Sequence, residues 1–337
     1  MDKLIFGLLS YVKYDETVPN NDKNKKRLQD VAGEFLSKKY HKEKNITAVR
    51  GSIKLLKIMK DKKRYADLLM YNNVYLTDDE QQFSALTIEI NQRLVYVSFE
   101  GTDQMISGWK EDFKMSYKFP VKSQKNAIIY LNKHFTHRNC EIILGGHSKG
   151  GNLALVAGMY ANFVVRKKII KIYSYDGPGL MKKQISSKRY KRIQNKFVHI
   201  VPNNSLVGLL LRHNSYTVVK SNNVGIMSHY ALTWQVTDED LVKDTLRTSS
   251  KEFDVSFKKW LDNYNINQRK LFVKEMFGIF KTHSIASLID IRSNPMVIVK
   301  LLKDVSSVDP IVNKMSKEFA NMVKRYFVKS VKEKIIK

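Results

Sequence analysis

The sequence predicts an α/β fold, in which helices flank a mainly parallel sheet and a helical extension follows. Apolar runs of strand length occur at 94–99, 142–144 and 169–175, with helix-patterned segments between them. Strands that alternate with helices along a chain usually form a parallel sheet. Past residue 240 the pattern becomes mostly helical, so we expect the sheet to end there. The 43% hydrophobic content of this 337-residue chain is enough for a sizeable core.

We expect three regions along the chain: an N-terminal helical segment at 1–45, an α/β core at 46–240 and a helical C-terminal extension at 241–337. Two strand-like runs flank the short polar connection at 91–93, which predicts a hairpin. The remaining expected elements of the core are a helix at 47–70, helices near 109–117 and 123–135, the strand and helix around residue 148, and the strand at 169–175.

The last part of the extension predicts an amphipathic helix that begins at Asp309-Pro310, because aspartate caps helices and proline fits the first turn. One face is rich in lysine. The other carries apolar residues at helical spacing: Val312, Met315, Phe319, Met322, Val323, Tyr326, Val331 and Ile335. Two roles fit this pattern. The helix packs on the core or its helical neighbours, or it lies on an anionic membrane surface.

The segment 141–158 contains Gly146-x-Ser148-x-Gly150, after an apolar run and before a stretch rich in small residues. This order predicts a strand, a tight turn and a helix, with serine at the apex of the turn. The glycines leave room for the turn, because larger side chains there would collide with the flanking strand and helix. A serine held in this way is equipped for nucleophilic attack on an acyl carbon. The alternative is a bystander serine in a tight turn.

Two backbone N–H groups are expected to bind the oxyanion that such an attack creates. The first belongs to Lys149, at the N-terminus of the helix that follows the serine. The second belongs to Thr102, in the turn after the strand at 94–99, where Gly101 lets the backbone approach a substrate. For this second segment, an ordinary glycine-containing turn is the alternative.

A catalytic serine of this kind is followed along the chain by an acid and then by a histidine. Asp176 is the single carboxylate between Ser148 and His229, and it ends a strand, which would bring it to the edge of the sheet where Ser148 lies. His229 is the first candidate for the general base and His213 is the alternative. His147 should point away from the site, since neighbours along a strand face opposite sides.

With these residues in place, the chain resembles the bacterial Mbeg-like branch of the α/β-hydrolases, which is distantly related to the class-3 lipases. The resemblance follows the chain in order through 83–85, 98–103, 108–113, 146–154, 176–179, 205–208, 218–221, His229 and Trp234. It implies a lipase or esterase fold, with Ser148 as nucleophile and Thr102 near the oxyanion.

The chain departs from the relatives at three positions. Class-3 lipases carry their acid just before a Val-Pro pair, whereas Val201-Pro202 here follows His199-Ile200. The acid must therefore come from elsewhere, and Asp176 is the local candidate. Glu100 and Tyr230 stand where many relatives have arginine and aspartate.

We therefore expect a serine hydrolase of carboxylic esters, with an ester or lipid as substrate, that needs no metal and no organic cofactor. The same constellation also serves thioesters and amides. The rival expectation is a non-catalytic module of the same fold that binds an anionic membrane surface or a protein partner, since fold alone does not fix function.

The net charge of +27 favours anionic partners. Basic residues are densest at 182–196, so an anionic membrane surface is a candidate partner. No nucleic-acid-binding motif is present, and we expect no nucleic acid. The single cysteine, Cys140, excludes a disulfide framework, and no apolar run reaches the roughly 20 residues of a membrane span. We expect a cytoplasmic protein that is able to lie peripherally on a membrane.

Overall fold

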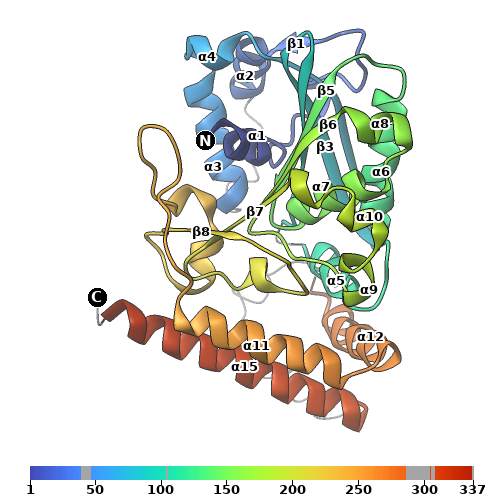
Figure 1. The fold of residues 1–337 in the computed structure, drawn as a ribbon, viewed down its shortest axis with the longest axis vertical. Helices are drawn as coiled ribbons and strands as arrows, with labels where there is room; N and C mark the ends of the chain where they lie inside the picture. The colour runs from blue at the N-terminus through green and yellow to red at the C-terminus, as the bar shows by residue number, and fades with distance from the viewer. Residues whose placement is uncertain (39–46, 104, 286–303, 305–307, 336–337) are drawn as a thin grey trace.

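The computed structural model describes residues 1–38, 47–103, 105–285, 304 and 308–335. Within them, one sheet of eight strands has a spatial order that follows the sequence (Figure 1). The strands are β1 (Lys26–Arg27), β2 (Leu69–Asp78), β3 (Gln81–Asn91), β4 (Leu94–Phe99), β5 (Glu141–His147), β6 (Ile169–Tyr175), β7 (Phe197–Pro202) and β8 (Thr217–Val219).

Four of the seven neighbouring pairs, from β4 to β8, are parallel, and the three from β1 to β4 are antiparallel. The mainly parallel sheet is thus confirmed, as is the hairpin of β3 and β4. The helix expected at 47–70 is shorter than predicted. It divides into α3 (Thr47–Met59) and α4 (Lys63–Ala66), and β2 begins soon after because its backbone pairs along β3.

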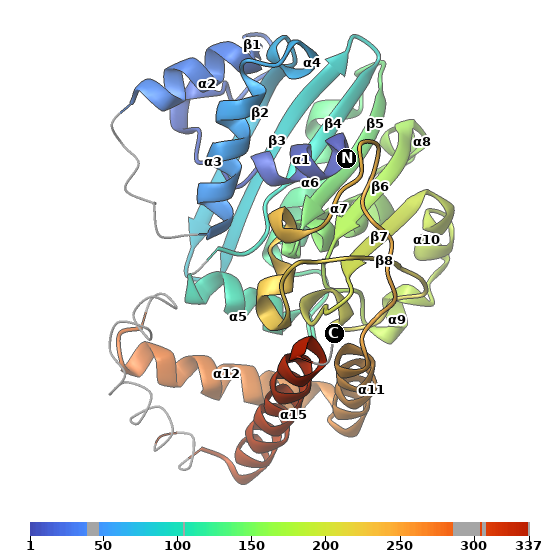
Figure 2. The ribbon, with the colours of Figure 1, turned by 90° about the vertical axis from the view of Figure 1, so that its left-hand side faces the viewer.

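Helices cover both faces of the sheet (Figures 1 and 2). One face carries α1 (Asp2–Leu9), α2 (Leu28–Ser37) and α3, and the other carries α6 (Lys122–Phe135), α7 (Lys149–Tyr160), α8 (Phe163–Lys168) and α10 (Lys188–Lys191). Neighbouring residues of β4 therefore pack into different cores. Tyr96 lies in the cluster that contains Phe6, and Val97 lies in the cluster that contains Leu131. Burial on both faces accounts for the nearly continuous apolar runs of these strands.

The register of the parallel strands brings three connections to one end of the sheet. Phe99 at the end of β4 pairs with Gly146, and His147 at the end of β5 pairs with Tyr175 at the end of β6. The turns that follow β4, β5 and β6 are therefore neighbours, and they carry Thr102, Ser148 and Asp176.

Three C-terminal helices form a layer against this end of the molecule: α11 (Thr248–Asn263), α12 (Ile266–Thr282) and α15 (Pro310–Ile335) (Figures 1 and 2). α11 and α15 lie side by side, and their apolar side chains form one cluster with those of α12 and α5 (Ile106–Lys114). Of the two roles expected for the last helix, packing on its neighbours is the one that the structure shows.

The apolar face of α15 is shorter than the sequence pattern indicates. Val312 and Met315 are fully buried, whereas Val331 and Ile335 are 52% and 79% exposed. The last turns attach instead through polar groups, since the Glu333 carboxylate accepts hydrogen bonds from the backbone N–H and hydroxyl of Ser249.

The division into three regions stays a prediction. The expected boundary at 45/46 lies outside the described residues, and the one at 240/241 falls in the connection before α11. In the part of the chain that the structure describes, no helix combines the length and the apolar character needed to cross a bilayer.

Two substitutions on α15 distinguish packing from a surface role. Met315→Ala should lower the free energy of unfolding by about 2–5 kcal/mol, because it leaves a cavity in a fully buried position. Val331→Ala, at an exposed position of the same helix, should change it by less than about 0.5 kcal/mol. Urea denaturation of the full chain measures both. Equal effects of the two substitutions would contradict the packing shown here.

Candidate active site

Ser148 occupies the tight turn that the sequence predicts, between the end of β5 and the start of α7. Its backbone has φ 57° and ψ −132°, a conformation that costs a non-glycine residue about 1–3 kcal/mol and is concentrated at functional sites. The flanking glycines are needed for steric reasons. A Cβ on Gly146 would lie 2.5 Å from the carbonyl oxygen of Phe99, and a Cβ on Gly150 would lie 2.0 Å from the same atom.

Asp176 and His229 meet in a short hydrogen bond, with 2.6 Å between the carboxylate Oδ2 and the imidazole Nδ1. Asp176 follows β6 and is fully buried. Its other oxygen, Oδ1, accepts from the hydroxyl of Ser205 at 2.5 Å and from the backbone N–H of Gly208 at 3.1 Å. The carboxylate accepts a hydrogen bond from Nδ1–H, so the free lone pair of His229 lies on Nε2, the nitrogen that a general base would use.

Ser148 and His229 line one cavity of about 350 Å³, and Thr102 lines it too. Among the described residues, no direct hydrogen bond joins the Ser148 hydroxyl to the His229 ring; such contacts often tighten only when substrate binds. The rest of the lining is mostly apolar and aromatic. It comprises Trp109, Asp112, Phe113, Ser116, Pro178, Leu206, Val207, Leu210, Leu211, Ile226, Phe257, Trp260, Phe272, Phe319, Val323 and Phe327.

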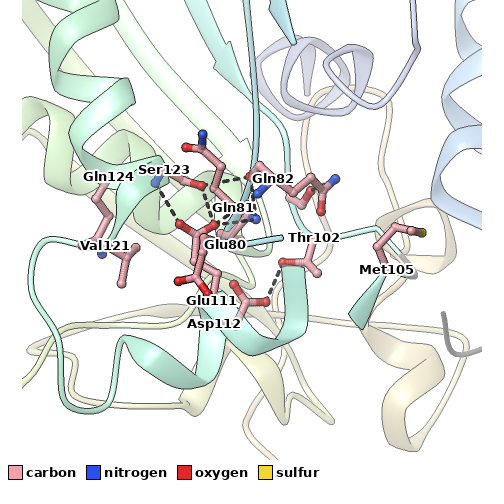
Figure 3. A network of polar contacts seen from close by, with 12 residues as sticks. Glu80, Gln81, Gln82, Thr102, Met105, Glu111, Asp112, Val121, Ser123 and Gln124 are labelled. Atoms are coloured by element: carbon pink, nitrogen blue, oxygen red, sulfur yellow. Dashed lines mark hydrogen bonds and ion pairs between the residues drawn. The ribbon is translucent and has the colours of Figure 1, made fainter. Parts of the chain in front are cut away.

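Thr102 is fixed beside the cavity by α5. Its hydroxyl donates to Oδ2 of Asp112 at 2.5 Å, and Figure 3 shows the two side chains pointing toward each other. Burial raises the pKa of Asp112 to about 6. Within the described part of the chain, the second oxygen of this carboxylate has no hydrogen-bond partner. Asp112 was not among the expected site residues, because its contact with Thr102 depends on how α5 packs.

Lys149 is the first residue of α7, so its backbone N–H belongs to the four at a helix N-terminus that have no partner within the helix. Its side chain is completely buried, which no pattern in the sequence indicated. The ammonium donates to the carbonyl of Gln82 at 2.8 Å and pairs with Glu111 at 3.4 Å. Glu111 also accepts from the backbone and hydroxyl of Ser123 (Figure 3). Polar partners on both groups offset the cost of burying this ion pair.

The alternative base, His213, does not meet Asp176. Its ring stacks on that of His199 with 4.2 Å between centroids, and its Nε2 lies 3.2 Å from the carbonyl oxygen of Leu210. Burial lowers the pKa of His213 to about 3. His283, the last histidine of the chain, pairs with Asp304 in the C-terminal region. Among the described residues, His229 is therefore the histidine that the fold brings to Asp176.

The C-terminal helices contribute to the site in two ways that no motif in the sequence indicated. Phe257 and Phe319 are among the aromatic residues that wall the cavity from α11 and α15. α15 also contacts the segment that carries His229. The Tyr326 hydroxyl donates to the backbone carbonyl of Asn204 at 2.7 Å, and the Ser330 hydroxyl accepts at 3.0 Å from the N–H of Gly225, the first residue of the 3₁₀ helix η4 (Gly225–His229).

Within the described residues, no group of three or more histidine, cysteine or acidic side chains is placed to hold a metal ion.

Comparisons with known proteins give one family match. The model of the Mbeg1-like family matches residues 59–278. No curated protein matches the chain. Among solved structures, M37 lipase is similar over 61% of this chain and 67% of its own, with 15% identity and a TM-score of 0.37. The native Rhizomucor miehei lipase propeptide complex is similar over 46% of this chain and 58% of its own, with 13% identity and a TM-score of 0.36.

The raised pKa of Asp112 predicts a pH-dependent stability. The folded pKa of about 6 exceeds the usual 3.8, so the native state binds more protons than the unfolded state between these values. The contribution of Asp112 to stability is therefore largest below about pH 4 and is lost as pH rises to about 6. Urea denaturation from pH 4 to pH 7 should show Asp112→Asn gaining stability relative to the unmodified protein as pH rises. A difference that is independent of pH would contradict this.

Proposed function

The chain belongs to the Mbeg1-like family, and we propose that it is a serine hydrolase that cleaves carboxylic esters of lipid-like substrates. The main support for the proposal is the 2.6 Å hydrogen bond between Asp176 and His229. This pair lies beside Ser148, because His229 and Ser148 line the same cavity. A serine in a strained turn, a histidine and a buried acid are the components of nucleophilic acyl transfer.

The proposed reaction has two halves. The Ser148 oxygen attacks the ester carbonyl carbon while Nε2 of His229 takes the hydroxyl proton, and the Asp176 carboxylate stabilises the imidazolium that forms. The backbone N–H groups of Lys149 and Thr102 bind the oxyanion. When the carbon–oxygen bond to the alcohol breaks, His229 returns the proton to the alcohol. Water then attacks the acyl carbon while His229 takes a proton from the water. His229 gives this proton to the Ser148 oxygen as the acyl–oxygen bond breaks, which releases the acid and restores the hydroxyl.

The lining of the cavity supports an apolar acyl group. Aromatic and aliphatic side chains surround the space beside Ser148, and burial of methylene groups against them is favourable by about 0.8 kcal/mol for each. The volume of about 350 Å³ is at the lower end of the range for small-molecule sites. A single acyl chain suits this cavity better than a bulky polar acid.

Replacement of the nucleophile tests the reaction itself. Ser148→Ala should lower turnover of a short p-nitrophenyl ester by about 10⁴-fold or more, because the covalent route is lost. Asp176→Asn should also lower it strongly, since the imidazolium loses its charged partner. Ser215→Ala, at an exposed serine outside the cavity, is the matched control. Retained activity in Ser148→Ala would end the proposal.

The acyl pocket is tested by filling it. Val323 lines the cavity from α15, and Val323→Trp should lower kcat/KM for a decanoyl ester roughly tenfold or more while an acetyl ester keeps its rate. Val331→Trp, on an exposed part of the same helix, serves as the control. An equal loss for both esters would show that the cavity does not hold the acyl chain.

A second candidate function is a non-catalytic module that binds an anionic membrane surface. Two observations favour it: the net charge of +27, and the exposure of Ile226 and Met227, 40% and 50%, next to His229. Binding to phosphatidylglycerol vesicles should then fall steeply between about 0.05 and 0.5 M salt. Salt-dependent binding without reaction of Ser148 with a fluorophosphonate would favour this module. Labelling of Ser148 would favour the hydrolase. Vesicle binding that does not change with salt concentration would exclude an electrostatic surface role.

A further inference from the structure

We propose that Tyr11 and His147 are positioning residues, which hold the backbone of His229 and the loop that carries Thr102 in register with Ser148. The effect that we expect these two residues to have on turnover rests on the proposed hydrolase function. The two residues lie outside the cavity, and neither has a part in the proposed chemical steps.

His147 lies directly behind the proposed nucleophile. It is the last residue of β5, and its side chain is 4% exposed. The ring faces away from α7, as the alternation along a strand predicts, and contacts Tyr11, which follows α1 on the opposite face of the sheet (Figure 1). Tyr11 is 1% exposed. The pair is therefore enclosed in the core beneath the site.

The contacts of His147 determine where its proton lies. Nε2 is 2.7 Å from the backbone carbonyl oxygen of His229, and a carbonyl only accepts, so Nε2 carries the hydrogen. Burial lowers the pKa of His147 well below its usual value, so the ring is neutral and Nδ1 is an acceptor. Burial also raises the pKa of Tyr11 well above its usual value, so the phenol keeps its proton and donates to Nδ1 at 3.0 Å.

The hydrogen bonds thus run in one direction, from the Tyr11 hydroxyl through the His147 ring to the His229 backbone. The last of them restrains the residue whose side chain pairs with Asp176. The centroids of the two imidazole rings are only 4.4 Å apart. A neutral His147 adds no positive charge beside the imidazolium that His229 would form during the reaction, whereas a charged neighbour at this distance would oppose it.

Tyr11 and His147 also contact the loop after β4. A Cβ on Gly101 would lie 1.9 Å from the Tyr11 hydroxyl and 2.6 Å from the carbonyl oxygen of His147, so the loop backbone lies directly against both residues. Two residues after Tyr11, the Lys13 ammonium pairs with the buried Glu100 carboxylate at 2.6 Å. The N-terminal segment, which precedes the matched region at 59–278, therefore contacts the loop after β4 directly and is linked to His229 through His147.

Three substitutions of His147 test the donated hydrogen bond. The amide nitrogen of glutamine reaches the position of Nε2 and is able to donate to the His229 carbonyl. Asparagine reaches only the position of Nδ1, and phenylalanine offers no donor. His147→Gln should keep kcat within about threefold of the unmodified protein, whereas His147→Asn and His147→Phe should lose about 10-fold to 100-fold. KM should stay within about twofold in all three, because His147 does not line the cavity.

A second measurement needs no activity. The Nδ1–H proton of His229, donated to Asp176, should give a downfield proton NMR resonance in the free protein, identified by its loss in Asp176→Asn. The resonance should persist in His147→Gln and disappear or broaden in His147→Phe. If the resonance responds in this way but no Ser148-dependent turnover exists, the positioning role stands and the hydrolase proposal fails. Equal kcat in the three variants, or a resonance that is the same in His147→Gln and His147→Phe, would overturn the inference. So would a loss that appears only in the melting temperature of His147→Asn and His147→Phe.

Discussion

The burial of one carboxylate, Asp176, constrains the arrangement of the whole site. An ionised group without exposure to water is stable only when donors surround it. Here the donors come from three places along the chain: the hydroxyl of Ser205, the backbone of Gly208 and the imidazole of His229. The connection after β7 and the connection after β8 must therefore meet at the end of β6. Displacing the imidazole would leave one oxygen of a fully buried acid without a partner.

The segments outside the family match hold the histidine from two sides. From the N-terminal side, Tyr11 acts through His147 on the carbonyl of His229. From the C-terminal side, Ser330 of α15 accepts from the first residue of η4, the 3₁₀ helix that ends in His229. A short 3₁₀ helix has poorer hydrogen-bond geometry than an α-helix, so it fixes its residues less firmly. The histidine that we propose as the base is thus held by tertiary contacts rather than by local structure.

Much of the site was predictable because its constraints are local. The glycines around Ser148 are required by the approach of the Phe99 carbonyl, and that requirement is visible as a fixed spacing in the sequence. Asp176 was identifiable because no other carboxylate lies between Ser148 and His229. Its position near Ser148 then followed from the order of the parallel strands, because β5 and β6 end side by side at one edge of the sheet.

The remainder depends on contacts between segments that no spacing reveals. His213 and His229 are both loop histidines late in the chain, and they differ in that His213 packs against His199 whereas His229 pairs with Asp176. The burial of the Lys149 ammonium depends on Glu111, which is 38 residues away along the chain. The aromatic residues of the cavity wall form an ordinary apolar helix face in the sequence pattern. Such a pattern does not indicate which surface the face covers.

The most direct test of the proposed site is a crystal structure of the protein after reaction with a long-chain alkyl phosphonate, whose phosphoryl oxygen occupies the place of the oxyanion. We expect a bond from phosphorus to the Ser148 oxygen, with the phosphoryl oxygen about 2.7–3.1 Å from the backbone nitrogens of Lys149 and Thr102. The alkyl chain should lie in the cavity between α5 and α15. A phosphonate bound to another residue, or one whose phosphoryl oxygen faces away from both nitrogens, would contradict the proposed site.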